Sequence, residues 1–346
     1  MLSVGIDPHK RVFSAVALDS QAKFVDAFSG DNAPHAFPRF LHWLLSLPDT
    51  PTIAIEGAFS FGRPLSRFLL DHGFSVFDCN PRWTAAFRSS ARRQHKTDLA
   101  DARAVAQVLL RDGPDLPRVL PDDASAVLDL LVSERDALLA EMTRSRNQLH
   151  ALLFDLGVPA SSLASPRALE RVLQALPHPS SPRETALLAF VRRLITRLLA
   201  AHADLATLTR QVEELAALHY APLTTIPGVA LLTAGAIAAE LGSAHRFLSD
   251  AQLAAFAAAA PIEASSAGSL RHRLNRGANR KLNAILYRIS LTQRRHDPRA
   301  RAYIARRRAE GKSLREAVRA HKRFIIRAIF HAWISCFTPP PPLSCT

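Results

Sequence analysis

Short apolar runs separated by short polar turns dominate the first part of the chain. Three such runs follow one another closely, at residues 2–7, 12–18 and 23–28, and their spacing predicts an antiparallel meander of three strands. Two further apolar runs and three segments with a helical spacing of apolar residues come next. The additional strands are predicted at 52–56 and 74–78 and the helices at 36–47, 63–72 and 98–111, which gives the order βββαβαβα.

Two signals mark the ends of the last helix in this region. Thr97 precedes it and is a suitable N-cap, because a threonine hydroxyl can accept a hydrogen bond from a backbone N–H of the first turn. Gly113 and Pro114 follow the helix and are predicted to end it. The region up to residue 114 is therefore predicted to be one α/β domain.

The pattern changes in the middle of the chain. Spaced Leu, Val and Ala residues with mixed charges predict two long helices, at about 124–156 and 182–219. Between them stand Gly157 and five prolines, which predict a loop or a broken helix. Two such helices could form an antiparallel hairpin, a coiled-coil arm of a dimer or a bundle within one subunit, and the sequence alone leaves these possibilities open.

Helical patterns continue to the end of the chain, where four consecutive prolines at 339–342 predict a disordered tail. The predicted fold class is therefore α/β followed by all-α. We expect an α/β domain at 1–114, a helical or coiled-coil arm at 115–220, a helical domain at 221–337 and a disordered tail at 338–346.

Composition narrows the class of protein. The chain has 346 residues, 48% of them hydrophobic, which allows two or three domains with real cores and excludes a mainly disordered protein. No apolar stretch reaches the roughly 18 residues of a membrane span, and the first residues lack the pattern of a signal peptide. The three cysteines, Cys79, Cys336 and Cys345, have neither disulfide nor metal-ligand spacing. These features predict a soluble, cytoplasmic protein.

The positive charge of the chain is concentrated in one segment. The net charge is +14, but residues 271–327 alone contain 19 Lys and Arg against three acidic residues, so the rest of the chain is nearly neutral. A solvated helical face is the ordinary explanation of a basic run. So large an excess of one sign repels itself unless a polyanion neutralises it, and arginine, the commoner cation here, suits bidentate phosphate contacts. The segment therefore predicts nucleic acid as the partner.

Four carboxylates stand where the predicted α/β domain could bring them together. Asp7 and Glu56 end two apolar strands, where a buried unpaired carboxylate is costly. Asp98 and Asp101 are three residues apart and so share one face of a helix. A cluster of four carboxylates repels itself unless divalent cations neutralise it, and oxygen-only ligands suit Mg²⁺ or Mn²⁺. Two such ions can clamp a phosphodiester during its displacement.

Each acidic residue also has a simpler explanation. Asp98 suits a helix N-terminus, Asp101 could pair with a nearby arginine, and Asp7 could cap the turn before Pro8. Taken together in the order βββαβαβα, however, the four favour a metal site. This combination resembles the ribonuclease-H-like (RuvC-like) nuclease fold with its D-E-D-D set.

A second group of motifs lies nearer the C-terminus. Residues 225–242 read TIPGVALLTAGAIAAELG, in which Pro-Gly between two apolar helical stretches predicts a helix-hairpin-helix that could bind DNA phosphate. An AP…SS string, the string RHRL.R..NR.LN and Gly311-Lys312 follow, and VGIDPHK, AIEGA and HKTDLADA stand earlier. From Ser3 to about Phe330 the chain resembles the transposases of bridge-RNA-guided insertion sequences. These are the Piv-type DEDD recombinases of insertion-sequence family one-hundred-ten.

The resemblance implies a composite recombinase. The RuvC-like domain would bring Asp7, Glu56, Asp98 and Asp101 to magnesium or manganese, and the C-terminal domain would supply a serine nucleophile from the AP…SS string. Ser266 is the expected nucleophile and Ser265 the alternative. Two departures bear on this position: Ala267 stands where the family often has glycine, and so does Ala258. The intact acidic set argues against a decayed copy.

The resemblance also implies the partners and the place of action. A covalent serine–DNA phosphodiester would conserve bond energy for rejoining, and a non-coding guide (bridge) RNA would specify the sites. The protein would act as a homodimer or homotetramer at the bacterial nucleoid. Residues in the basic segment are expected to contact phosphate: Arg271, Arg273, Arg276, Arg280 and Lys281. His9, His95 and His272 could assist, although a solvated histidine is the simpler interpretation of each.

Two other classes of function fit part of this pattern. A RuvC-like nuclease or junction resolvase would cut with metal-activated water and form no covalent intermediate. A non-catalytic nucleic-acid-binding protein would use the basic segment alone and would not depend on the carboxylates. A protein–DNA adduct that survives denaturation separates the recombinase from the nuclease.

Overall fold

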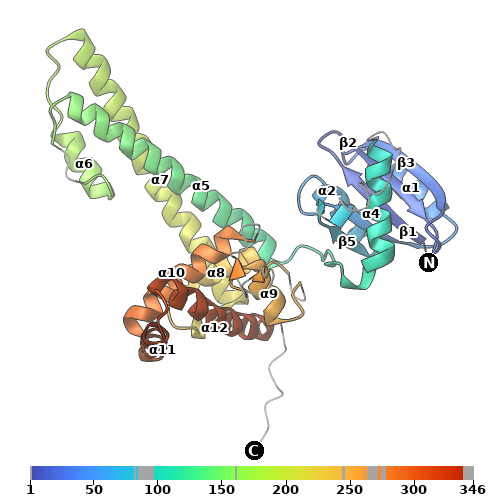
Figure 1. Cartoon of the computed structure of the whole chain (residues 1–346). Coiled ribbons are helices and arrows are strands. Elements are labelled where there is room, and N and C mark those ends of the chain that lie inside the picture. Colours follow the sequence, from blue (N-terminus) through green and yellow to red (C-terminus); the bar gives the residue numbers. More distant parts are fainter. Residues whose placement is uncertain are drawn as a thin grey trace, which may run out of the picture. The chain divides into compact units, whose positions relative to one another are not determined.

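The computed structural model describes residues 2–81, 83–84, 97–159, 162–243, 246–260, 262–263, 272–273 and 278–337 (Figure 1). The chain forms two compact units, Met1–Asp122 and Asp123–Thr346, and each is considered by itself. The predicted tail at 338–346 lies outside the described residues. Of the helices in the described part, none has both the length and the apolar composition that a bilayer crossing needs.

A five-stranded mixed sheet forms the centre of the first unit. Its order is β3-β2-β1-β4-β5, with β1–β2 and β2–β3 antiparallel and β1–β4 and β4–β5 parallel. The predicted meander of three strands is thereby confirmed. The strands are β1 (Leu2–Pro8), β2 (Val12–Leu18), β3 (Phe24–Asp31), β4 (Pro51–Glu56) and β5 (Val76–Cys79).

Helices cover both faces of this sheet. On one face, α1 (Phe37–Ser46) and α2 (Arg63–Asp71) pack against alternate residues of β1, such as Val4 and Ile6. On the other face, α4 (Asp98–Asp112) packs against β1 and β2 and is followed by the short 3₁₀ helix η1 (Gly113–Asp115). Because both faces are covered, β1 is buried along its whole length and reads as a continuous apolar run.

Two long helices dominate the first part of the second unit. α5 (Ala124–Asp155) and α7 (Pro182–His219) lie side by side, as Figure 1 shows. The predicted loop or broken helix between them contains a nine-residue helix, α6 (Pro166–Gln174), whose N-cap Ser165 accepts a hydrogen bond from Ala168 N. One apolar cluster, which includes Met142, Leu169 and Ile195, joins all three helices. The pair is thus a hairpin within one chain, while the coiled-coil dimer arm stays a prediction.

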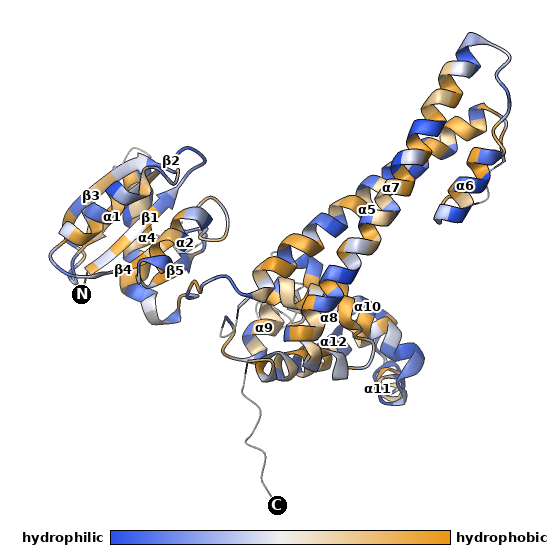
Figure 2. Cartoon of the chain, turned by 180° about the vertical axis from the view of Figure 1, so that it is seen from behind, coloured by the Kyte–Doolittle hydropathy of each residue, from blue (hydrophilic) through white to orange (hydrophobic). Residues whose placement is uncertain are grey.

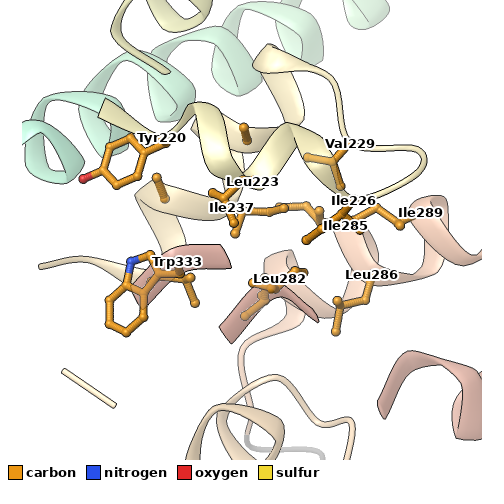
Figure 3. Packing of buried hydrophobic residues seen from close by; sticks show 14 of the residues in the cluster. Tyr220, Leu223, Ile226, Val229, Ile237, Leu282, Ile285, Leu286, Ile289 and Trp333 are labelled. Atoms are coloured by element: carbon orange, nitrogen blue, oxygen red, sulfur yellow. The ribbon is translucent and has the colours of Figure 1, made fainter. Parts of the chain in front are cut away.

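A second apolar core joins the remaining helices (Figure 3). Leu128 of α5 and Val212 of α7 belong to it, together with Trp333 near the C-terminus, so the base of the hairpin is built into this core. The elements after the hairpin are η2 (Ala221–Thr225), α8 (Leu231–Leu241), α9 (Asp250–Phe256), β6 (Ile262–Glu263), β7 (His272–Arg273), α10 (Arg280–His296), α11 (Pro298–Ala309) and α12 (Leu314–Ser335).

Two features of this region bear on the predictions. The paired strands β6 and β7 were not expected in a helical domain. At the Pro-Gly motif, Gly228 has φ +85°, which favours glycine, and it is preceded by the 3₁₀ helix η2 and followed by α8. The helix-hairpin-helix therefore stays a prediction, and so does the division of the chain at residues 114 and 220.

Candidate functional site

Pairing of β1 with β4 brings the first two predicted carboxylates to one edge of the sheet. The strands are parallel, with Ile6 opposite Ile55, so Asp7 and Glu56 both follow this pair at the carboxyl ends of neighbouring strands. Asp7 is 7% exposed and lies on the face of β1 opposite to that of Ile6. The register therefore places Asp7 beside Glu56, as the sequence predicted.

A close approach of α4 to β1 brings in the other two carboxylates. Gly5 faces α4, and a Cβ atom at this position would overlap backbone atoms of Ala102 and Ala106. The glycine thus lets the helix lie directly on the strand. Asp98 and Asp101 occupy the first turn of α4, behind the N-cap Thr97, whose Oγ1 accepts a hydrogen bond from Ala100 N at 3.2 Å. Asp101 is buried, while the Asp98 side chain is 56% exposed.

His9 connects two of the four acidic residues. Its Nε2 lies 3.4 Å from Asp7 Oδ2 and 3.4 Å from Asp98 Oδ1. The turn that carries it is fixed by Asn32, whose Nδ2 donates to the carbonyl oxygens of His9 and Phe61, each at 2.9 Å. The His9 side chain is half-exposed, so it stands at the solvent edge of the carboxylate group. A solvated histidine was the simpler expectation; the structure gives it two carboxylate neighbours.

The electrostatics of Asp7 show that all four carboxylates act on one another. Burial raises the pKa of Asp7 to about 6, His9 opposes this shift, and the charges of Glu56, Asp101 and Asp98 add to it. Repulsion between like charges in a partly buried place favours the protonated form. A cation bound among these groups would reverse that preference.

Glu56 is held by a neighbouring hydroxyl. The buried Thr84 donates from Oγ1 to Glu56 Oε1 at 3.2 Å. The loop after β4 is fixed by Asp78, whose Oδ1 accepts a hydrogen bond from Ala58 N at 2.9 Å. These contacts hold the carboxylate at the end of β4 in a defined position.

The donor set fits a hard divalent cation. Asp7, Glu56, Asp98 and Asp101 offer carboxylate oxygens only, which Mg²⁺ and Mn²⁺ prefer. Within the described ranges, no three His, Cys, Asp or Glu side chains are grouped tightly enough to hold a metal as they stand. The group therefore has the right chemistry and charge, and binding would draw its members closer.

The predicted nucleophile falls beside the second sheet. β6 and β7 pair antiparallel, with Ile262 opposite Arg273, and the intervening stretch carries Ser265 and Ser266. Both serines, together with Arg271 and Arg276, lie outside the described residues. Of Arg273 only the backbone, in β7, is described.

The other two predicted phosphate ligands begin α10. Arg280 is exposed, whereas Lys281 Nζ lies 3.8 Å from Glu240 Oε1. Glu240 also accepts a hydrogen bond from Asn279 Nδ2 at 2.5 Å. Lys281 is thus partly engaged within the protein, and Arg280 is the freer cation of the pair.

Three contributors to the carboxylate group were not singled out from the sequence: Gly5, Thr84 and Asn32. Gly5 stands inside an apolar strand, where an isolated glycine is a known sign of a close backbone approach. That signal could have been used. Thr84 and Asn32 act through contacts between residues more than 20 positions apart, which no local pattern reveals.

Comparisons with known families match both parts of the chain. A transposase family of the DEDD type, from the IS110 group, matches residues 4–156. The family described as transposase IS116/IS110/IS902 matches residues 220–305. The first range contains all four carboxylates, and the second contains the serine pair.

Two relatives agree with this result. The chain is 30% identical over 215 residues to the transposase for insertion sequence element IS1328 of Yersinia enterocolitica, and this alignment covers 59% of each protein. It is 27% identical over 282 residues to the insertion element IS110 uncharacterized 43.6 kDa protein of Streptomyces coelicolor, covering 68% of this chain and 70% of the relative. The alignment with the first relative thus spans less than two thirds of that protein.

Among solved structures, RuvC of T. thermophilus in complex with a Holliday junction substrate aligns with 34% of this chain. The alignment covers 99% of RuvC, with 16% identity and a TM-score of 0.28. The fold of the first unit is defined by its own strand order and by the two helical layers described above. From the two family matches and the two relatives, the chain belongs to the IS110 family of transposases.

Proposed function

We propose that the chain is a DNA transposase that cuts and rejoins strands through a covalent serine–DNA intermediate. Asp7, Glu56, Asp98 and Asp101 would hold Mg²⁺ or Mn²⁺, and Ser266 would be the nucleophile, with Ser265 as the alternative. The observation that carries the proposal is the mutual electrostatic influence of four carboxylates at one edge of the sheet. A bound cation would supply charge neutralisation at the phosphate.

The covalent step conserves the number of phosphodiester bonds. The serine oxygen forms a bond to phosphorus, the bond from phosphorus to one deoxyribose oxygen breaks, and the departing oxygen takes up the proton that serine loses. Attack by a DNA hydroxyl reverses the step and frees the serine. No ATP is needed, because the bond energy stays in the serine–phosphate linkage.

His9 and the basic segment would assist in different ways. His9 lies within 3.4 Å of Asp7 and Asp98, where it can orient both carboxylates. Exposed cations such as Arg280 would hold the DNA backbone. Arg271, Arg273, Arg276 and Lys281 complete the proposed phosphate contacts.

Guide RNA and self-association belong to the same proposal. The resemblance to bridge-RNA-guided elements supports a non-coding RNA that specifies donor and target, and a homodimer or homotetramer in which two subunits cooperate. If so, recombination requires RNA transcribed from the DNA that flanks the gene. The mass of the protein–RNA complex in solution would exceed that of one chain with one RNA.

Covalent trapping tests the central step. Purified protein is incubated with RNA, labelled DNA carrying the element's ends, and Mg²⁺, and then denatured. We expect a labelled protein–DNA adduct that disappears in Ser266→Ala and in Asp7→Asn. Loss in Ser265→Ala alone would move the nucleophile by one position.

Efficient cutting without any adduct would contradict the serine mechanism. It would favour a nuclease that uses metal-activated water, since the carboxylate group lies wholly within the first unit. DNA-linked activities that survive Asp7→Asn and Asp98→Asn would instead indicate a binding protein without catalysis.

A further inference from the structure

A cavity of about 550 Å³ lies in the second unit, between α10, α11 and α12. Cationic side chains contribute much of its lining: Arg307, Lys312, Arg319, Lys322 and Arg323, against the single acidic residue Glu316. Ala258, Ala259 and Ala260 form one wall. The helices that surround it belong to the basic segment, and Figure 2 shows hydrophilic colouring on α11.

Not all of these charges are free to bind a ligand. Arg323 donates to Asp250 O at 3.1 Å and pairs with its carboxylate at 3.0 Å, and Arg307 is paired with Glu310 at 2.6 Å. Glu316 accepts hydrogen bonds from the N–H and hydroxyl of Ser313 in a capping box. Its charge is therefore engaged at the helix start, and this leaves the cavity with an excess of positive charge.

Lys322 gives the cavity a fixed cation at its inner wall. It is only 6% exposed, and its Nζ donates to Asn283 Oδ1 at 2.8 Å and to Asn283 O at 3.2 Å. The ammonium also lies 5.3 Å from the ring centre of Tyr287. Burial and the nearby Arg319 lower the pKa of Lys322, which shows that the site holds positive charge without enough anion to balance it.

Arg307 has a donor that nothing in the described part of the protein satisfies. Its Nε is buried without a hydrogen-bond partner, although the side chain lines the cavity. A buried unsatisfied donor is costly, and an anion in the cavity is the kind of partner that would remove this cost. The unpaired donor thus points to a ligand with acceptor oxygens.

An aromatic edge distinguishes the cavity from a simple phosphate site. Phe324 lines it and is 53% exposed, and its ring packs edge-on against Tyr303 with centres 4.8 Å apart. Cations that bind phosphate beside an exposed aromatic ring are the combination used for strands of nucleic acid. A free phosphate ion would make no use of Phe324.

The cavity adjoins the stretch that carries the serine pair. The chain passes from its wall at Ala260 directly into that stretch, and Asn283 Nδ2 donates to Ala257 O at 2.7 Å. Asn283 therefore ties the alanine wall to the α10 position that also holds Lys322. A ligand bound here would lie where the serine-bearing stretch begins.

We propose that this cavity binds a phosphodiester group of the DNA strand on which the serine acts. Lys312 and Arg319 contact the phosphate from the solvent side, and Lys322 contacts it from the inner wall. Phe324 covers the adjoining sugar or base. This assignment rests on the proposed function, and it adds a binding pocket to the predicted phosphate contacts at 271–281.

Substitutions at the exposed side of the cavity test the assignment without disturbing the core. Arg319→Gln and Lys312→Gln each remove one cation, while Arg315→Gln removes the same charge from the exposed face of the same helix, outside the cavity lining. Binding of a labelled DNA strand, the matching duplex and an RNA of the same sequence is measured by fluorescence anisotropy at several salt concentrations.

We expect Arg319→Gln and Lys312→Gln each to weaken binding of the DNA strand about tenfold more than Arg315→Gln does. The slope of log affinity against log salt should fall by about 0.9 for each lost contact. Phe324→Ala should weaken DNA binding while leaving this slope unchanged, because it removes no charge. Inorganic phosphate should compete only weakly with the DNA.

Equal losses in the cavity variants and in Arg315→Gln would overturn the proposal, because the cavity would then add only general charge. A loss confined to the RNA would overturn the assignment to DNA. These results are independent of the serine step: wild-type protein that binds DNA without forming an adduct would contradict the proposed function and leave the cavity to be judged by binding alone.

Discussion

Two alanines adopt a backbone conformation that normally favours glycine. Ala258 has φ +54° and Ala22 has φ +61°. In this left-handed region the Cβ atom crowds the following carbonyl oxygen, which costs roughly 1–2 kcal/mol for an L-residue. Ala258 is the position where the family often has glycine, and the structure thus supplies the physical reason for that preference.

Replacement of Ala258 by glycine should therefore stabilise the second unit. The relief of strain exceeds the entropy that glycine loses on folding, so Ala258→Gly should raise the free energy of unfolding by up to about 1 kcal/mol. Ala259→Gly is the matched control, since Ala259 has no positive φ, and it should lower stability by up to about 1 kcal/mol. Denaturant unfolding measures both, and a loss of stability in Ala258→Gly would contradict the argument.

Asp7 should make the first unit less stable at neutral pH when no metal is bound. Its pKa is raised to about 6 from 3.8, so the native state binds a proton more tightly than the unfolded chain does, and stability falls as the pH rises from about 4 to above 6. Asp7→Asn should accordingly raise the thermal midpoint of metal-free protein at pH 7.5.

The gap between Asp7→Asn and wild type should narrow as the pH is lowered through 6, because wild-type Asp7 then becomes protonated as well. The more exposed Asp98→Asn serves as the control and should give a smaller change. Adding Mn²⁺ should stabilise wild type and have little effect on Asp7→Asn. A pH-independent gap would contradict the assigned cause.

At the scale of elements, the contact between β1 and α4 decides whether the four carboxylates meet. Gly5, Ala102 and Ala106 allow the helix to lie directly on the strand, and this contact sets the position of Asp98 and Asp101 over the strand ends. The alternation along β1 places Gly5 and Asp7 on the same face, so the contact and the carboxylate are linked by two positions in sequence.

A methyl group at Gly5 should push α4 away from the sheet. Gly5→Ala is expected to destabilise the first unit by about 3 kcal/mol, because the neighbouring atoms are backbone and cannot rotate aside. It should also weaken Mn²⁺ binding more than the loss of stability alone explains. Gly113→Ala is the control: its Cβ would only touch Leu109 at 3.7 Å, and metal binding should be unaffected. Normal metal affinity in folded Gly5→Ala would contradict this role.

At the scale of the whole molecule, the chain consists of two units with separate cores. The carboxylate group belongs entirely to the first unit, and the hairpin, the cavity and the serine-bearing stretch belong to the second. The hairpin is not independent of the helices that follow, because Leu128 and Val212 share a core with Trp333.

This organisation predicts which fragments fold. Residues 1–122 alone should fold and bind Mn²⁺, since all four carboxylates and both helical layers are present. Residues 123–219 alone should be unstable at the base of the hairpin, which would lose the core formed with the C-terminal helices. Circular dichroism with thermal unfolding of both fragments, beside 123–346 as the control, checks this. A cooperative, stable 123–219 fragment would contradict it.

The amino-acid sequence by itself determined most of the local structure. Strand periodicity, the Thr97 cap and the proline-rich interruption predicted the helices and strands of the first unit and both long helices, because these signals act between neighbours in sequence. The acidic set could also be predicted, since a carboxylate at the end of an apolar strand is unusual wherever it occurs.

Only the tertiary structure decided which distant residues meet. The register of β1 and β4, the seating of α4 on Gly5, the two contacts of His9 and the cavity around Lys322 all depend on residues far apart in the chain. Such contacts are selected by packing and burial over the whole fold, and no local sequence pattern encodes them.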